Sequence, residues 1–271
     1  MLLKTEQTFI ADKKFRYFTL GNPSNEMLVL LHGYPDNLQI WYKIAPLLAE
    51  KYFVFGFDWP GMGYSEEWAG GATPVAMAKR LKEIFAHFNF KQAHLFSHDM
   101  GGQAALVFAA LFPEQTKSVS VLNSLLMWSE KTSWEINLLR KFKFNQLVIN
   151  HLPGIVFHRA LNTFIHNTSS IDDAVKKDMW QAFQDKKVRR YIVRMCAGYQ
   201  AQLKKLPDYY EKITCPVNLI WGEKGKHFSI GHAQALKKIC GRAKIHSIEA
   251  GCHWMVLDKQ VEISQILLKS V

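Results

Sequence analysis

The residues with the clearest chemical potential form a short polar run, Ser97-His98-Asp99-Met100-Gly101-Gly102. This run follows an apolar stretch, His94–Phe96, and opens a helix of small residues, so a strand end would hold its side chains. A second reactive side chain, His253, follows the last predicted strand. A carboxylate is a weak base that suits displacement at a saturated electrophilic carbon, and an imidazole can activate water. Asp99 and His253 are therefore the types of group that hydrolysis through an aspartyl ester requires.

Four motifs in order resemble the α/β-hydrolase fold superfamily. Its nucleophile elbow reads G-x-S-x-G, and here Ser97, Asp99 and Gly101 take the three key positions, with aspartate in place of the serine. His32-Gly33-Tyr34-Pro35 matches the family's HGxP oxyanion loop. Asp58-Trp-Pro-Gly61-Met-Gly63-Tyr-Ser65 matches its DxxGxGxS turn. Gly251-Cys252-His253-Trp254 matches the segment of its catalytic histidine. An alternative with Ser97 as the nucleophile lacks a small residue at Leu95. The chain resembles the aspartate-nucleophile branch, which contains epoxide hydrolases and haloalkane dehalogenases.

This resemblance implies a role for each matching residue. Asp99 would be the nucleophile and His253 the base, and the backbone N–H groups of Tyr34 and Met100 would form the oxyanion hole. Epoxide hydrolases of this branch protonate the oxirane oxygen with cap tyrosines, and Tyr199 matches that position best. Tyr34 belongs to the oxyanion loop and is not expected to be a donor. The implied function is an epoxide hydrolase that acts on a small apolar electrophile with water.

Two other functions compete with this interpretation. The first is a haloalkane or haloacid dehalogenase, whose haloalkane members usually carry Trp where this chain has Met100. The segment HGYPDNLQIW resembles fluoroacetate dehalogenases, but Met100 and Gln103 replace their carboxylate-binding arginines. The second, of another class, is a non-catalytic binding protein with the α/β-hydrolase fold.

The acid that should orient the histidine departs from the family pattern. In Trp221-Gly222-Glu223-Lys224-Gly225, a glycine, Gly225, stands at the expected acid position. Asn123 follows an earlier predicted strand, and its amide oxygen could accept the imidazole N–H. We therefore predict Asn123 as the orienting residue, and two acidic side chains are alternatives, Glu223 and Glu130.

The chain alternates between apolar runs and helical patterns, as parallel α/β proteins do. The predicted strands are Met27–Leu31, Tyr52–Phe57, His94–Phe96, Ser118–Leu122, Pro216–Trp221 and Ala243–Ile248. The predicted helices are Gln39–Glu50, Pro74–Phe88, Gly101–Phe112, Gly231–Ile239 and a last one after Asp258. The alternation stops between about 126 and 212, where helical patterns prevail. We predict an α/β-hydrolase core, 1–125 and 213–271, with a mostly parallel sheet flanked by helices and an inserted helical cap, 126–212.

Composition narrows the remaining possibilities. The 271 residues are 48% hydrophobic, which suits one packed core and excludes a disordered chain. The longest apolar run, Ala104–Phe112, is too short to span a membrane, and the N-terminus MLLKTEQTF lacks the apolar region of a signal peptide. The four cysteines show no metal-binding or disulfide spacing, which favours a reducing cytoplasm. No metal or organic cofactor is expected, because the proposed chemistry needs only water.

The charge is strongly positive and concentrated in the predicted cap. The net charge is +11, and residues 131–212 carry 15 basic and 7 acidic side chains. No nucleic-acid-binding signature accompanies this charge, so a nucleic-acid partner is not expected. A peripheral contact between the cap and an anionic membrane remains open, as does the oligomeric state.

Overall fold

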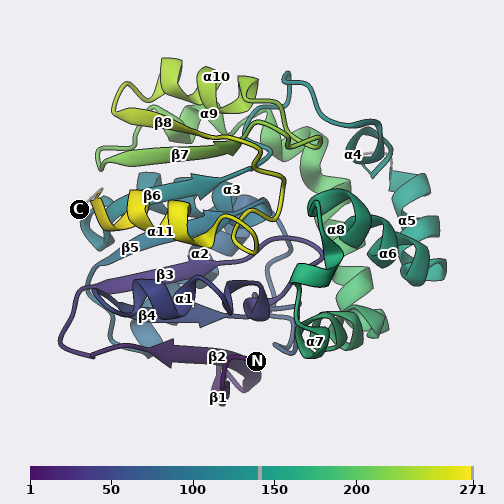
Figure 1. Cartoon of the computed structure of the whole chain (residues 1–271), viewed down its shortest axis with the longest axis horizontal. Helices are drawn as coiled ribbons and strands as arrows, with labels where there is room; N and C mark the ends of the chain where they lie inside the picture. Colours follow the sequence, from purple (N-terminus) through teal and green to yellow (C-terminus); the bar gives the residue numbers. More distant parts are fainter. Residues whose placement is uncertain (140–141, 270–271) are drawn as a thin grey trace.

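One sheet of eight strands organises the part of the chain that the computed structural model describes, residues 1–139 and 142–269 (Figure 1). At 139, 142, 143, 199 and 200 the backbone alone is described. The strands lie in the order β1-β2-β4-β3-β5-β6-β7-β8. Their bounds are β1 Glu6–Ile10, β2 Lys13–Leu20, β3 Met27–Leu31, β4 Phe53–Phe57, β5 Ala93–His98, β6 Thr116–Leu122, β7 Val217–Gly222 and β8 Ala243–Ile248. The predicted α/β-hydrolase architecture with a mostly parallel sheet is confirmed.

The strands from β4 to β8 are parallel neighbours, and β5 and β7 are buried along their whole length. Continuous apolar runs suit this position because helices cover both faces of such a sheet. The first two strands are antiparallel and were not predicted. Their sequence, for example KKFRYFTL in β2, mixes charged and aromatic residues in no clean alternation.

Helices cover the sheet on both faces (Figure 1). On one face α1, Ala45–Leu48, contacts α11, Gln260–Lys269. On the other, contacts run in series from α2 through α3 and α9 to α10. The bounds of these four helices are α2 Pro74–His87, α3 Met100–Leu111, α9 Pro207–Tyr210 and α10 Gly231–Ile239. The predicted helix Gln39–Glu50 is shorter than expected, since a 3₁₀ turn at Leu38–Trp41 precedes the single turn of α1.

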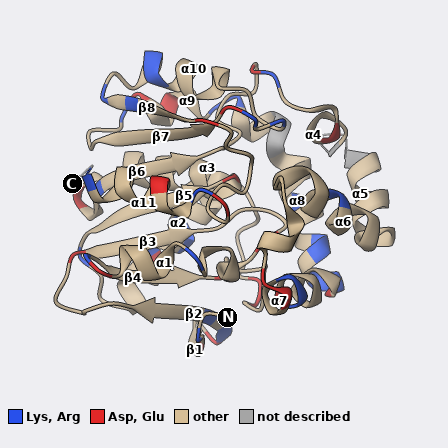
Figure 2. Cartoon of the chain, in the orientation of Figure 1, with Lys and Arg blue, Asp and Glu red and all other residues tan. Residues whose placement is uncertain are grey.

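Five further α-helices separate β6 from α9 in the described residues, and they lie beside the sheet, where the parallel strands end (Figure 1). We call them the inserted helices: α4 Trp134–Leu139, α5 Phe142–His151, α6 Pro153–Phe164, α7 Asp173–Gln184 and α8 Lys186–Leu203. Basic side chains occur both on the inserted helices and on the helices that flank the sheet (Figure 2). Within the described residues, no helix has the length and hydropathy needed to cross a bilayer.

Candidate active site

Asp99 occupies the tight turn between β5 and α3. Its backbone angles, φ 51° and ψ −124°, are unusual for a residue with a side chain, and such strain concentrates at functional sites. The turn is held by the Asp99 N–H, which donates to the Leu122 carbonyl at 3.2 Å, and by Ser124 Oγ, which donates to the Asp99 carbonyl at 2.5 Å. Gly101 lies so close to the Leu31 carbonyl that a Cβ there would overlap it. The elbow therefore requires glycine at the start of α3.

The backbone N–H groups predicted for the oxyanion hole both reach the Asp99 carboxylate. The Tyr34 N–H donates to Asp99 Oδ1 at 3.2 Å, and the Met100 N–H also hydrogen-bonds this carboxylate. Gly33 permits the approach, because any side chain at that position would collide with Asp99. Two backbone amides thus hydrogen-bond the carboxylate of Asp99.

The other carboxylate oxygen faces His253. His253 Nε2 lies 3.6 Å from Asp99 Oδ2, and the imidazole is 2% exposed. Aromatic rings pack around it, with centroid distances of 4.5 Å to Phe164 and 5.6 Å to His227. Two chain segments more than 150 residues apart therefore meet in a buried, closely packed site.

Burial shifts the two ionisable groups in opposite directions. It raises the pKa of Asp99 to about 6, with a further increase from the negative charge of Asp36 and opposition from His98 and the two amides. Burial also lowers the pKa of His253 well below its usual value, and the nearby His98 and His227 lower it further. At pH 7 to 8 the site therefore holds an ionised carboxylate beside a neutral imidazole.

Asn123 acts on the main chain of His253. Its Nδ2 donates to the carbonyls of Cys252 and His253 at 2.7 and 3.0 Å, and its Oδ1 accepts from the Gly222 N–H at 3.1 Å. Through these three bonds Asn123 holds the loop that carries the His253 ring. The predicted hydrogen bond from the imidazole N–H to the Asn123 amide oxygen is not among these contacts.

The other candidates for the orienting acid contact other parts of the chain. Glu223 is exposed and accepts from Ser247 Oγ at 3.0 Å. Glu130 lies beside Gly231 at the start of α10. Ser97, the alternative nucleophile, is fully buried in β5 and donates to the Ser120 carbonyl at 3.0 Å.

A buried pair of side chains next to the site, an aspartate and a histidine, was not predicted from the sequence. His98 Nδ1 lies 3.4 Å from Asp36 Oδ2, and its Nε2 bonds the His253 carbonyl at 3.1 Å. Both side chains are fully enclosed. The signal was present in the sequence, because Asp36 follows the HGYP run directly and His98 precedes Asp99.

A cavity of about 240 Å³, with almost wholly apolar walls, is lined by Tyr34 and Phe164, which contact Asp99 and His253. Tyr34, Phe164 and His227 line it on the side of the site. The inserted helices supply the remaining walls, among them Trp134, Phe144, Val148, Ile155 and Ala160. Arg159 also borders it, but it is half-exposed and pairs with Glu135 at 2.6 Å. The cavity thus suits an apolar molecule.

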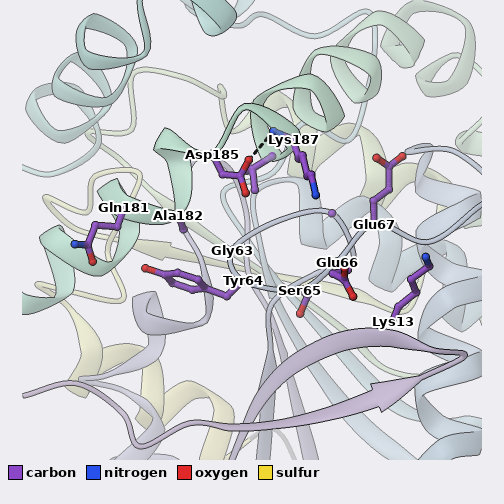
Figure 3. Close-up of a pocket in the computed structure, with 12 residues that line it drawn as sticks. Lys13, Gly63, Tyr64, Ser65, Glu66, Glu67, Gln181, Ala182, Asp185 and Lys187 are labelled. Atoms are coloured by element: carbon purple, nitrogen blue, oxygen red, sulfur yellow. Dashed lines mark hydrogen bonds between the residues drawn. The ribbon is translucent and has the colours of Figure 1, made fainter.

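A second pocket, of about 420 Å³, lies between the loop after β4 and the junction of α7 with α8 (Figure 3). Charged side chains of both signs line it, including Lys13, Glu67 and Lys187. None of the predicted catalytic residues reaches it.

Tyr191, the tyrosine of the inserted helices whose side chain is described, is engaged elsewhere. Arg80 donates to the Tyr191 hydroxyl at 2.8 Å, which holds that side chain in the contact with α2. Tyr199 lies in α8, but its side chain is outside the described part of the structure. Within the described residues, no group of three or more His, Cys, Asp or Glu side chains could hold a metal ion.

Comparison with known proteins shows the family to which the chain belongs. The model of the alpha/beta hydrolase fold matches residues 26–260. The soluble epoxide hydrolase of Corynebacterium sp. is 23% identical over 97% of this chain and 95% of its own length. The fluoroacetate dehalogenase of Burkholderia sp. is 36% identical over 37% of this chain and 34% of its own length. The solved 2-hydroxy-6-oxo-6-phenylhexa-2,4-dienoate hydrolase of Rhodococcus sp. superimposes with a TM-score of 0.83 at 20% identity, covering 99% of this chain and 98% of that one. Because the family model spans most of the sequence, the chain belongs to the α/β-hydrolase fold family of hydrolases.

Proposed function

We propose that this protein is an epoxide hydrolase that uses Asp99 as its nucleophile and His253 as its base. One observation carries the proposal: Asp99 Oδ1 accepts the backbone N–H of Tyr34, while Oδ2 lies 3.6 Å from His253 Nε2. A single carboxylate therefore has one oxygen in an oxyanion site and the other free to attack.

In the first step Asp99 Oδ2 attacks a saturated carbon of the substrate and forms an ester, and the leaving group departs with the bonding electrons. Oδ1 becomes the ester carbonyl oxygen. In the second step His253 takes a proton from water, and the hydroxide adds to Cγ of Asp99. The negative charge then develops on Oδ1, to which the Tyr34 N–H already donates, and the Met100 N–H also hydrogen-bonds this carboxylate.

The cavity supports an apolar substrate. Its cationic neighbour, Arg159, is already paired with Glu135, so it is poorly placed to bind a substrate carboxylate. Gln103, at a position where fluoroacetate dehalogenases have an arginine, donates to the Leu125 carbonyl at 2.9 Å. These contacts disfavour a haloacid. A haloalkane stays the second candidate, because it is apolar and reacts through the same ester.

The test is to trap the ester. We expect His253→Gln to lose turnover by about 10²- to 10⁴-fold, since the base for the second step is gone while the nucleophile is intact. Incubated with a panel of epoxides and haloalkanes, this variant should gain the mass of one substrate. Peptide mass spectrometry should place the adduct on Asp99, and the reacting panel member identifies the substrate class.

The double variant His253→Gln/Asp99→Asn is the matched control and should gain no mass. An adduct on another residue would contradict the assignment of the nucleophile. If no panel member labels the variant while wild type binds members without converting them, the protein is a binding protein of this fold.

The pH dependence of the first step gives an independent check. Because burial raises the pKa of Asp99 to about 6, the fraction of reactive carboxylate should increase from pH 5 to pH 7. In His253→Gln, the rate of ester formation should therefore rise about tenfold over this range and level off above pH 7. Rapid-quench mass spectrometry at fixed epoxide concentration measures it. A rate that is constant from pH 5 to 8 would contradict a nucleophile with a raised pKa.

A further inference from the structure

The hydroxyl of Tyr34 is buried and has no hydrogen-bond partner. Burying such a group without a partner costs free energy, so an orphaned hydroxyl in an active site indicates a contact that is completed by a ligand. The side chain of Tyr34 lines the apolar cavity, and its ring lies 6.1 Å from that of Phe183 in α7. Its own backbone N–H holds the Asp99 carboxylate. Tyr34 thus links the nucleophile to the substrate cavity.

No other tyrosine whose side chain is described offers a buried, unpartnered hydroxyl. Tyr191 accepts from Arg80, and Tyr210 donates to the Leu126 carbonyl at 3.2 Å. The family resemblance implies that a tyrosine of the inserted helices protonates the leaving group. Tyr34, in the oxyanion loop, is therefore a second candidate for this role.

We propose that Tyr34 is the acid that protonates the oxygen released when Asp99 opens an epoxide. This inference rests on the proposed function and narrows it to substrates whose leaving group is an oxygen. A halide leaves without a proton, whereas an alkoxide is a strong base and its departure is aided by a donor.

The proton balance closes over the two steps. As Asp99 Oδ2 bonds to the oxirane carbon, the carbon–oxygen bond breaks towards oxygen, which takes the Tyr34 proton and leaves a phenolate. In hydrolysis His253 receives one proton from water. The hydroxide, with the other proton, adds to Cγ of Asp99, and the ester bond then breaks. The proton of the resulting carboxyl group passes to the ester oxygen of the departing diol. The imidazolium then returns its proton to the phenolate, so one epoxide and one water give one diol.

The surroundings of Tyr34 keep it in its acid form. Burial raises the pKa of its phenol well above the usual value, and the nearby Cys196 and Asp99 raise it further. The hydroxyl is therefore protonated before each turnover, as a donor must be.

The test uses the trapping variant as its parent, so that only ester formation is observed. With epoxides such as styrene oxide, we expect His253→Gln/Tyr34→Phe to form the Asp99 adduct about 10²- to 10⁴-fold more slowly than His253→Gln. With any haloalkane that labels the parent, the rate should be unchanged. Tyr64→Phe in the same parent is the control, because Tyr64 is partly exposed and its hydroxyl bonds the Asp178 carbonyl at 3.3 Å.

The unfolding midpoint separates a chemical role from a structural one. Removing a hydroxyl that has no partner should leave the midpoint unchanged or raise it. Tyr34→Met, which also lacks a donor, is the second variant if the phenylalanine packs poorly.

A rate unchanged by both variants would overturn the assignment while leaving Asp99 as the nucleophile. Equal slowing with epoxide and haloalkane would also overturn it, because the residue would then only position the nucleophile. A parent that forms no Asp99 adduct overturns the proposed function and this inference with it.

Discussion

Asp99→Asn is expected to abolish turnover and, at pH 8, to make the fold more stable than wild type. Turnover should fall by at least about 10⁴-fold, because the amide cannot form the ester and loss of a nucleophile has effects of this size or larger. The stability gain follows from burial: the pKa of Asp99 rises from 3.8 to about 6 in the folded state. At about 1.4 kcal/mol per pKa unit, the ionised carboxylate lowers stability by up to about 3 kcal/mol.

The sign of this effect gives it a pH signature. In the folded state Asp99 binds its proton more tightly than in the unfolded state, so its unfavourable contribution is absent below about pH 4 and complete above about pH 7. The stability difference between Asp99→Asn and wild type should therefore grow from pH 5 to pH 8. Urea unfolding at the two pH values measures it, and intact mass verifies that the amide persists.

Asp208→Asn, which makes the same chemical change at an exposed aspartate of α9, is the matched control. A difference between Asp99→Asn and wild type that is equal at pH 5 and pH 8 would contradict the raised pKa. Because the same burial that destabilises the carboxylate also strips it of water, the stability loss and the reactivity have one origin.

Asn123→Asp is expected to destabilise the protein by about 2–4 kcal/mol at pH 8. Asn123 Nδ2 donates to two carbonyls, those of Cys252 and His253, at 2.7 and 3.0 Å. A carboxylate at this buried position cannot donate a hydrogen bond, so its oxygens would face the two carbonyl oxygens and repel them. Urea unfolding should show the loss, and activity should fall because the loop that carries His253 is displaced.

The opposite result would be equally informative. If Asn123 oriented the imidazole ring through its oxygen, aspartate would restore the family's acid and raise the turnover of a folded protein. The exposed Asn162→Asp, which makes the same chemical change on α6, is the control and should leave stability unchanged.

The sequence by itself determined the fold and located the two side chains that we propose as nucleophile and base. Buried strands followed by glycine-containing turns are local patterns, because the close approach at Gly33 and Gly101 admits no side chain and a parallel sheet needs continuous apolar strands. Asp99 and His253 stood at strand ends, where the ends of parallel strands bring side chains together. Their 3.6 Å separation agrees with that expectation.

The edge of the sheet needed tertiary information. β2 carries a buried arginine, Arg16, whose charge is balanced by Asp58 and by Asp178 of α7, 162 residues further along the chain. No local pattern can predict that partner, so the strand does not stand out from its sequence.

The directions of side chains were also decided only in three dimensions. Asn123 and Tyr34 were identified as site residues by position, yet the amide bonds the main chain of the histidine loop and the phenol lines the cavity. Sequence spacing fixes which backbone atoms lie at the end of the sheet. Which polar atoms find partners there, and which are left for a ligand, depends on packing against helices from distant parts of the chain.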